Sequence, residues 1–526
     1  MCDWPDLEFR FYVGSGPMNR TTSSRNAEPR ARRSSGRRAA SAPPVSVHVE
    51  RERDELLYRQ VYRELVQLIR SGRLRPAARL PSSRVLAQEL GIGRNTVLLA
   101  LDHLMSEGYV ETRRGHGTYV AAELPDRTPF RFDAQADVRP RPLELPERAR
   151  SLVSPAHRPV TTSGLLRPGE PGYTGFPFKL WARLLWESWR QPHRKLLNGS
   201  HAAGYPPLKA AIADYLAAVR GIACTANQVI IVSGIRQVLT VAARLLLDRG
   251  DAVWLEDPGY PPLRGPLVAA GAKLVPVELD REGLSVRAGQ RAAPRPKLIC
   301  IVPAHQYPLG ITMSEARRRE LLDYARQVDA WIFEDDYDSE WWYGGRMLPA
   351  VQSLDREGRV IYAGTFSQLL FPSIRLGYAV VPTHLVEPFL AAQQALDDQP
   401  SMLVQPALAR FIADGHLATH LRRQRQRYKI KQELMLAAAH RHLGGLLELS
   451  ADPGGMQLIG YLHADLLARM DDVEASRRAA AVGFAAHVLS AHWMGTAQRQ
   501  GLILGYTALP ERQFDTVVSR LARALS

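Results

Sequence analysis

Short apolar runs alternate with helix-like patterns through the middle of this 526-residue chain. The runs lie at 229–232, 252–255, 298–302, 331–334, 360–363 and 378–381. Continuous apolar strands separated by helices indicate a sheet that is buried on both of its faces. The sequence therefore predicts a large α/β domain with a mostly parallel central sheet.

Length and composition limit the remaining choices. A chain this long exceeds one hydrophobic core, so we expect several domains. No run of about 18 uncharged apolar residues is present, which argues against a membrane span. The first 16 residues lack the pattern of a signal peptide, so we expect a cytoplasmic protein. Cys2, Cys224 and Cys300 are too scattered to predict a disulfide framework or a metal site.

Positive charge is concentrated near the start of the chain, which carries a net charge of +15. Residues 20–38 contain seven arginines against one acid, Glu28. Such a composition cannot bury a core, so residues 1–46 are predicted to be a disordered basic arm. The arm either adds phosphate contacts on DNA or is a solvated tail without a function.

Residues 47–121 have the pattern of a small helical domain that ends in a hairpin. Helices are predicted at about 56–69, 83–90 and 94–107, followed by strands at 108–111 and 118–120. Three helices and a glycine-tipped hairpin are typical of a winged helix-turn-helix. Residues 122–160 are rich in proline and predict a semi-extended linker.

Two motifs in this small domain resemble the GntR-type winged helix: residues 79–84 read RLPSSR and residues 91–97 read GIGRNTV. The resemblance implies contacts to double-stranded DNA from Arg84, Arg94, Asn95 and Thr96, and from Arg114 and Gly115 at the wing tip. Between residues 70 and 94, six arginines face one acid, which suits a phosphate-binding surface. The alternative is a winged helix used for protein contacts.

From about residue 161 to 526 the chain resembles the class I, fold-type-I aminotransferases, which depend on pyridoxal phosphate. The resemblance is carried by GYPPL at 204–208, EDPGYP at 256–261, PAHQYPLG at 303–310 and EDDYD at 334–338. It implies a smaller C-terminal α+β subdomain at about 385–526. The fusion of the two parts resembles the MocR branch of the GntR regulators.

The same resemblance implies a cofactor pocket. Asp335 corresponds to the acid that keeps the pyridine nitrogen protonated, Tyr337 would lie near the ring hydroxyl, and Tyr260 would stack on the ring. Thr365, Arg375 and the backbone of Ser233 and Gly234 correspond to the phosphate cradle. Arg499 is a weak candidate for gripping the carboxylate of an effector. Each residue taken alone has a structural explanation, such as packing, capping or a surface ion pair.

Residues 364–378, GTFSQLLFPSIRLGY, resemble the cofactor-anchoring segment of these enzymes, and Gln368 stands where they have the Schiff-base lysine. A carboxamide nitrogen is not basic, so it neither condenses with an aldehyde nor shuttles a proton. No lysine lies between residues 298 and 428 to replace it. Two further departures are the absence of a tyrosine from residues 198–203 and a glutamine, Gln457, where histidine is common.

The sequence therefore predicts a DNA-binding transcriptional regulator whose large domain forms a homodimer and senses a ligand without transamination. Pyridoxal or pyridoxamine phosphate would bind without a covalent bond, if either binds at all, and the effector would be an amine or amino acid. Two alternatives stay open. One is an aminotransferase that also binds DNA, and the other is a ligand-blind dimerisation scaffold.

Overall fold

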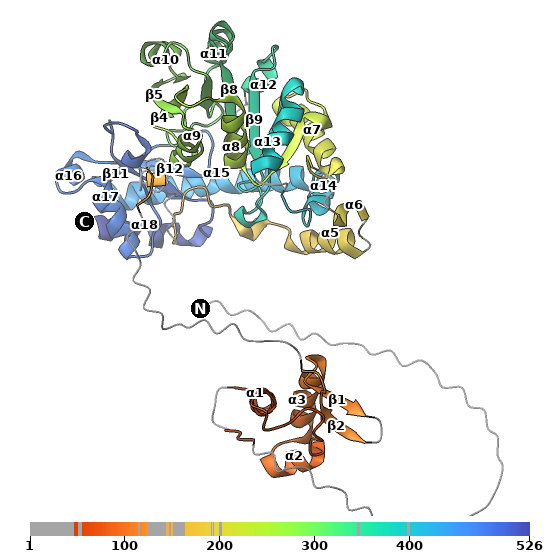
Figure 1. Cartoon of the computed structure of the whole chain (residues 1–526). Helices are drawn as coiled ribbons and strands as arrows, with labels where there is room; N and C mark the ends of the chain where they lie inside the picture. Colours follow the sequence, from red (N-terminus) through yellow and green to blue (C-terminus); the bar gives the residue numbers. More distant parts are fainter. Residues whose placement is uncertain are drawn as a thin grey trace, which may run out of the picture. The chain divides into compact units, whose positions relative to one another are not determined.

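The computed structural model describes residues 47–50, 55–113, 116–124, 144–146, 149–150, 164–190, 192, 194–198, 202–344, 348–396 and 400–526. The predicted arm, the wing-tip residues Arg114 and Gly115, and most of the predicted linker lie outside these residues. The chain separates into two compact units, Met1–Pro140 and Arg141–Ser526, and this division falls within the predicted linker (Figure 1). In the described part, no helix has the length and apolar character needed to cross a bilayer.

The first unit contains three helices and a hairpin. These elements are α1 (Leu57–Arg70), α2 (Ser83–Leu90), α3 (Arg94–Ser106), β1 (Val110–Arg113) and β2 (Gly117–Val120). The hairpin is antiparallel, with Val110 opposite Val120. The Ser82 side chain caps α2, and Gly91 ends it in the left-handed conformation that glycine adopts without strain. Val61 and Leu65 of α1 pack on Val97 and Leu101 of α3 to form the core.

The second unit is built on an eight-stranded sheet with the order β3-β10-β9-β8-β7-β4-β5-β6. Its strands are β3 (Val229–Val232), β4 (Ala252–Asp257), β5 (Lys273–Asp280), β6 (Gly283–Leu284), β7 (Leu298–Ile301), β8 (Trp331–Asp336), β9 (Val360–Thr365) and β10 (Gly377–Val380). In the sheet order, β5, β4, β7, β8 and β9 pair in parallel. Strand β6 pairs antiparallel with β5, and β10 lies antiparallel between β3 and β9. The predicted mostly parallel sheet is confirmed.

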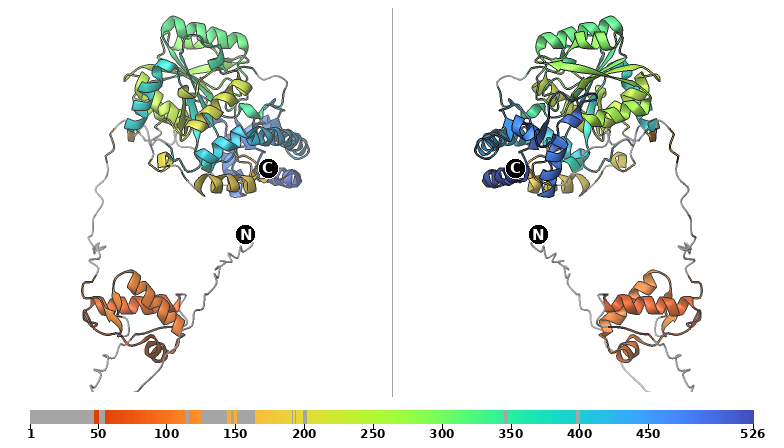
Figure 2. Two further views of the ribbon diagram at one scale, coloured as in Figure 1. Left: turned by 90° about the vertical axis from the view of Figure 1, so that its right-hand side faces the viewer. Right: turned by 90° about the vertical axis from the view of Figure 1, so that its left-hand side faces the viewer.

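Helices cover both faces of this sheet (Figure 2). They are α7 (Pro206–Arg220), α8 (Ile235–Leu246), α9 (Arg264–Ala270), α10 (Val286–Ala292), α11 (Glu315–Val328), α12 (Val351–Leu354), α13 (Val386–Leu396) and α14 (Gln405–Ala413). Helix α5 (Phe178–Arg190) packs against α14, and α6 (Arg194–Leu197) follows it in the chain (Figure 1). In β7, Leu298 and Cys300 face a cluster that contains α8 and α9 residues, and Ile299 faces one that contains α10 and α11 residues. This alternation explains why the strand reads as a continuous apolar run.

A smaller antiparallel sheet, with the order β11-β12-β14-β13, forms the C-terminal subdomain. Its elements are α15 (His416–His442), β11 (Leu447–Leu449), β12 (Gln457–Leu462), α16 (Ala464–Leu467), α17 (Asp472–Ala481), β13 (His487–Val488), β14 (Gly501–Gly505) and α18 (Phe514–Leu525). Leu165 forms a parallel bridge with Phe484, so the start of the second unit joins this sheet.

The structure differs from the sequence interpretation in two places. The predicted apolar runs do not include β5, because its side chains alternate between buried and exposed positions. Helix α13 falls within the range predicted for the C-terminal subdomain, but it packs with the large sheet: Phe389 is fully buried in the same cluster as Val238 of α8 and Ile230 of β3. The apolar face of a helix can pack on either the large sheet or the C-terminal subdomain, and the sequence of the helix alone does not specify which.

Candidate functional site

The predicted phosphate-binding residues come from two strands that flank β10. Ser233 and Gly234 follow β3 and precede α8, and Thr365 ends β9. Gly377 of β10 pairs with both strands, opposite Val232 and Thr365. A Cβ atom on Gly377 would lie 3.2 Å from Cα of Gly234, so the bare backbone lets the two segments approach. The start of α8 and the end of β9 thus lie on either side of Gly377, and a helix start attracts anions. The Thr365 hydroxyl accepts a hydrogen bond from the Ser367 amide at 3.1 Å.

Asp335 lies in β8, next to β9, and its side chain is buried. Its Oδ1 atom is buried and accepts no hydrogen bond from the described residues. Burial raises the pKa of Asp335 well above its ordinary value, and the neighbouring Asp336, Glu256 and Asp338 raise it further. A carboxyl group in this environment favours a cationic or N–H donor as its partner. A protonated pyridine nitrogen has this chemistry, so Asp335 fits the ring of the implied cofactor.

Three tyrosines form an aromatic chain beside Asp335. The Tyr260 and Tyr307 rings meet edge to face at 5.5 Å between centroids, and the Tyr307 and Tyr337 rings do so at 6.1 Å. Tyr260 is 41% exposed, which leaves its ring open to a stacking partner. Tyr307 was not among the predicted site residues, although it lies in the PAHQYPLG motif that carries the resemblance.

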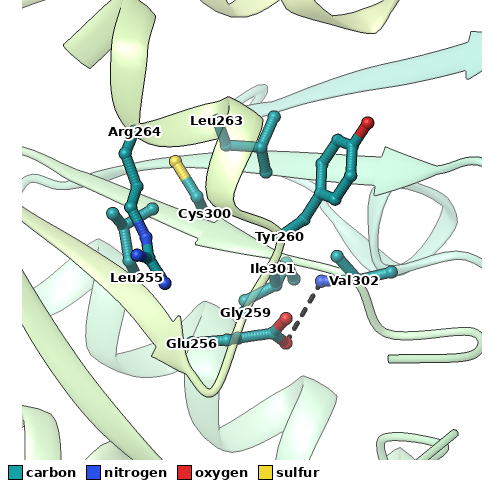
Figure 3. A pocket seen from close by; sticks show the side chains of 9 residues that line it. All are labelled: Leu255, Glu256, Gly259, Tyr260, Leu263, Arg264, Cys300, Ile301 and Val302. Atoms are coloured by element: carbon teal, nitrogen blue, oxygen red, sulfur yellow. Dashed lines mark hydrogen bonds between the residues drawn. The ribbon is translucent and has the colours of Figure 1, made fainter. Parts of the chain in front are cut away.

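A small hollow, with a cavity volume of about 10 Å³, adjoins Tyr260 of this tyrosine chain (Figure 3). Its lining residues are Leu255, Glu256, Gly259, Tyr260, Leu263, Arg264, Cys300, Ile301 and Val302. The Glu256 carboxylate accepts a hydrogen bond from the Val302 amide at 3.2 Å, while the Tyr260 side chain points away from it. Of the predicted cofactor residues, only Tyr260 lines the hollow. We therefore do not assign the hollow as the ligand site, and we interpret its other lining residues as packing beneath Tyr260.

Gln368 follows β9 by three residues, and its carboxamide lies beside Gly169. A Cβ atom on Gly169 would lie 3.4 Å from Nε2 of Gln368. The Oε1 atom of Gln368 is buried and accepts no hydrogen bond from the described residues. The carboxamide therefore offers an unused acceptor, as Asp335 does.

The Tyr337 hydroxyl is held from two directions. Nε2 of Gln457 donates to it at 3.4 Å, and Nδ1 of His305 lies 3.2 Å from it. The His305 ring also contacts Asp338 and Asp452, each at 3.0 Å. Burial alone would lower the pKa of His305, but the two carboxylates outweigh burial and raise that pKa well above its ordinary value. Sequence reasoning did not assign a role to His305.

Arg375 and Arg499 are the remaining predicted residues of the second unit. Arg375 directly follows a short 3-10 turn and precedes β10 by two residues, with its side chain exposed and a left-handed backbone. The Arg499 guanidinium lies over the Tyr461 ring, 3.3 Å from its centroid. Tyr461 is four positions along β12 from Gln457, or about 13 Å of strand. The structure therefore does not bring Arg499 to the other predicted residues.

In the first unit, the predicted DNA-contacting residues that the structure describes lie at or near the starts of α2 and α3. Arg84 lies in the first turn of α2, and Arg94 and Asn95 begin α3, all with exposed side chains. Nε of Arg94 donates to the Ser83 hydroxyl at 3.3 Å, which joins the starts of the two helices. Thr96 is partly buried, and Gly93 precedes α3 without a side-chain cap. The Arg79 guanidinium lies beside Gly117 at the start of β2.

Comparison with known proteins agrees with both halves of this description. The family described as bacterial regulatory proteins, gntR family, matches residues 57–120, and aminotransferase class I and II matches residues 173–468. The probable rhizopine catabolism regulatory protein MocR of Rhizobium meliloti is 40% identical, over 90% of this chain and 95% of its own length. The chain belongs to the MocR-type regulators of the GntR family.

Two further similarities bear on this MocR-type regulator. The pyridoxine biosynthesis transcriptional regulator PdxR of Corynebacterium glutamicum is 30% identical, over 89% of this chain and 95% of its own. The crystal structure of Pyrococcus horikoshii kynurenine aminotransferase in complex with pyridoxamine phosphate covers 73% of this chain and 95% of its own, with 26% identity and a TM-score of 0.63. The second unit of the regulator thus has the fold of pyridoxal-phosphate-dependent aminotransferases.

Proposed function

We propose that residues 47–121 bind operator DNA and that the aminotransferase-like unit binds a pyridoxal-phosphate-related ligand as a sensor, without converting amino acids. The related kynurenine aminotransferase structure contains pyridoxamine phosphate, which supports this class of ligand. The residues of this chain that would hold it are Ser233, Gly234, Thr365 and Arg375 at the phosphate, Asp335 and Tyr337 at the ring, and Tyr260 on its face. When bound, such a ligand supplies an electrophilic carbonyl or a primary amine on an aromatic ring.

The observation that carries the proposal is the pair of buried acceptors, Oδ1 of Asp335 and Oε1 of Gln368. A buried polar atom without a partner costs about 1–3 kcal/mol, so a ligand that satisfies both atoms gains affinity from them. The ring nitrogen of the ligand would donate to Asp335. Oε1 of Gln368, the second acceptor, would then be satisfied by a hydrogen-bond donor on the ligand substituent that faces it.

Gln368 gives the site a preference between the two forms of the ligand. Pyridoxamine phosphate carries an ammonium group that donates hydrogen bonds, whereas the aldehyde oxygen of pyridoxal phosphate only accepts them. A lysine at position 368 would repel the ammonium group, while the Gln368 carbonyl accepts from it. A hydrogen bond to a charged group is worth about 1.5–3 kcal/mol, so we expect the amine form to bind about 10- to 100-fold more tightly.

Lys431 does not offer a replacement for the missing amine. Lys431 is a buried lysine on α15, and its ammonium group donates to the Thr507 carbonyl oxygen at 2.6 Å. Burial lowers the pKa of Lys431, but the contact with Thr507 occupies its nitrogen. Transamination requires an amine that both forms the imine and moves the proton. We therefore propose that this chain does not catalyse it to an appreciable extent.

Isothermal titration calorimetry of the full chain with pyridoxal phosphate and with pyridoxamine phosphate tests the proposal. We expect both to bind reversibly and the amine form to bind more tightly. Gln368→Glu keeps the acceptors, adds a negative charge and should increase the preference, whereas Gln368→Leu should abolish it. Tighter binding of the aldehyde form by the wild-type chain would contradict the assignment of Gln368.

We further propose that this regulator is a cytoplasmic homodimer, which places two winged helices on two DNA half-sites. An amine or amino-acid effector regulates only if it favours one arrangement of the paired DNA-binding units. Two assays distinguish this proposal from the two alternative functions. Turnover of an amino acid with a keto acid would indicate an aminotransferase. A DNA affinity that is unchanged by every form of the ligand would indicate a dimerisation scaffold.

A further inference from the structure

The exposed side of α3 carries two large aliphatic residues next to its cationic start. Leu98 is 36% exposed and Leu99 is 51% exposed, whereas Val97, Ala100 and Leu101 of the same helix are buried in the core. The small core of the first unit does not use these two side chains. An exposed aliphatic residue on a DNA-facing helix has a chemical use, because it makes contacts that no polar side chain can make.

Leu98 lies on the side of α3 that carries Arg94, since residues four apart on a helix are neighbours. Arg94 in turn contacts Ser83 at the start of α2 through a 3.3 Å hydrogen bond. Leu98 is therefore adjacent to the surface formed by the starts of α2 and α3. Leu99 points about 100° further round the helix, away from Arg94. Asp102, exposed and one turn beyond Leu98, marks the end of this surface because a carboxylate repels phosphate.

The surroundings of Leu98 identify its partner as double-stranded DNA. The exposed Arg84 and Arg94 supply positive charge beside it, which suits phosphates rather than an apolar protein surface. Within the major groove, the C5-methyl group of thymine is the apolar feature of the base edges, and aliphatic side chains contact it. We propose that Leu98 reads a thymine methyl group in the operator. This inference rests on the proposed DNA binding and specifies part of the sequence that is recognised.

The test begins with a binding site chosen by in vitro selection from random duplexes with the full chain. Each thymine of that site is then replaced by deoxyuridine, which removes the methyl group and keeps every hydrogen bond. Burial of one methyl group is worth about a fourfold change in affinity. We expect fluorescence anisotropy to show a loss of about fourfold at one or more positions with the wild-type chain.

Variants at two exposed leucines complete the experiment. Leu98→Ala should weaken binding to the thymine site and lose its sensitivity to deoxyuridine at the same positions, while Leu98→Met should keep the sensitivity. Leu56→Ala is the control and should behave as wild type does, because Leu56 is 62% exposed and precedes α1, outside the two helices of the proposed interface. Uniform affinity across the deoxyuridine series, or sensitivity that persists in Leu98→Ala, would overturn the inference while DNA binding stands. Failure to select any site would overturn the proposed DNA binding itself.

Discussion

Nε2 of His305 lies 3.0 Å from Oδ1 of Asp452, although the two residues are 147 positions apart in the chain. His305 follows β7 of the large sheet, and Asp452 lies in the loop between β11 and β12 of the C-terminal subdomain. The other nitrogen of the same ring contacts Asp338 and the Tyr337 hydroxyl. A buried imidazolium thus connects the C-terminal subdomain to a tyrosine of the proposed ligand site.

Replacement of His305 by glutamine should destabilise the second unit in a pH-dependent manner. Because Asp338 and Asp452 raise the pKa of His305 well above about 6.5, its charged form stabilises the fold fully below that pH. The contribution is lost as pH rises through the raised pKa. Removing one member of a buried ion pair costs about 3–5 kcal/mol. Urea denaturation midpoints should differ most between wild type and His305→Gln at pH 6, and the difference should shrink toward alkaline pH.

A partly exposed histidine, paired with an exposed carboxylate, provides the control for this experiment. His442 lies 2.9 Å from Asp515, whose side chain is 60% exposed. Exposed ion pairs contribute about 1 kcal/mol or less, so His442→Gln should have a small effect at every pH. A His305→Gln variant that unfolds in parallel with wild type from pH 6 to pH 9 would contradict the charged state that we assign to His305.

The buried pair of Arg220 and Asp336 predicts a large effect that does not involve the ligand. Their side chains are 1% and 2% exposed, and Nη2 of Arg220 lies 2.8 Å from Oδ2 of Asp336. Arg220→Met leaves a carboxylate buried without its cation, so we expect a loss of about 3–5 kcal/mol in unfolding free energy. Adding Asp336→Asn should recover part of the loss. Arg291→Met, which breaks an exposed pair with Glu278, should change stability by less than about 1 kcal/mol.

The sequence specified the strands of the central sheet because burial on both faces leaves a continuous apolar run. Each of the six predicted runs lies wholly or largely within a strand of that sheet. The sequence did not specify the order and direction of the strands. Strand β10 lies antiparallel between β3 and β9, and its apolar residues would be compatible with a parallel position as well. The partner of α13 was missed for the same reason. Local patterns predict elements, and tertiary packing selects their neighbours.

Site residues were predictable where a short motif carried them. Asp335 and Tyr337 follow from EDDYD, and the structure brings them near Tyr260 through Tyr307. The role of His305 depends on Asp452, which lies far along the chain, so no local pattern reveals it. Arg499 stays a prediction, and its guanidinium lies over the Tyr461 ring.

Arg94→Ala should weaken specific DNA binding by about 1–3 kcal/mol, because Arg94 is exposed at the start of α3 and the Ser83 hydroxyl orients it. A gel-shift titration on a selected site measures the change. Arg63→Ala is the control, since Arg63 lies on α1 and pairs with Glu55 at 2.7 Å. Unchanged affinity of the Arg94 variant would remove the start of α3 from the interface.

Gln368→Lys tests whether the pocket still positions a cofactor as the related aminotransferases do. A lysine amine at this position, close to a bound pyridoxal phosphate, should condense with the aldehyde and release water. We expect a shift of the ligand absorbance to longer wavelength, and borohydride reduction should fix the ligand to residue 368, which mass spectrometry detects. Gln368→Met has a similar length without an amine and should give neither result. A Gln368→Lys variant that leaves the spectrum of pyridoxal phosphate unchanged and is not labelled after reduction would show that Asp335 and the phosphate cradle no longer hold the ligand in reach of position 368.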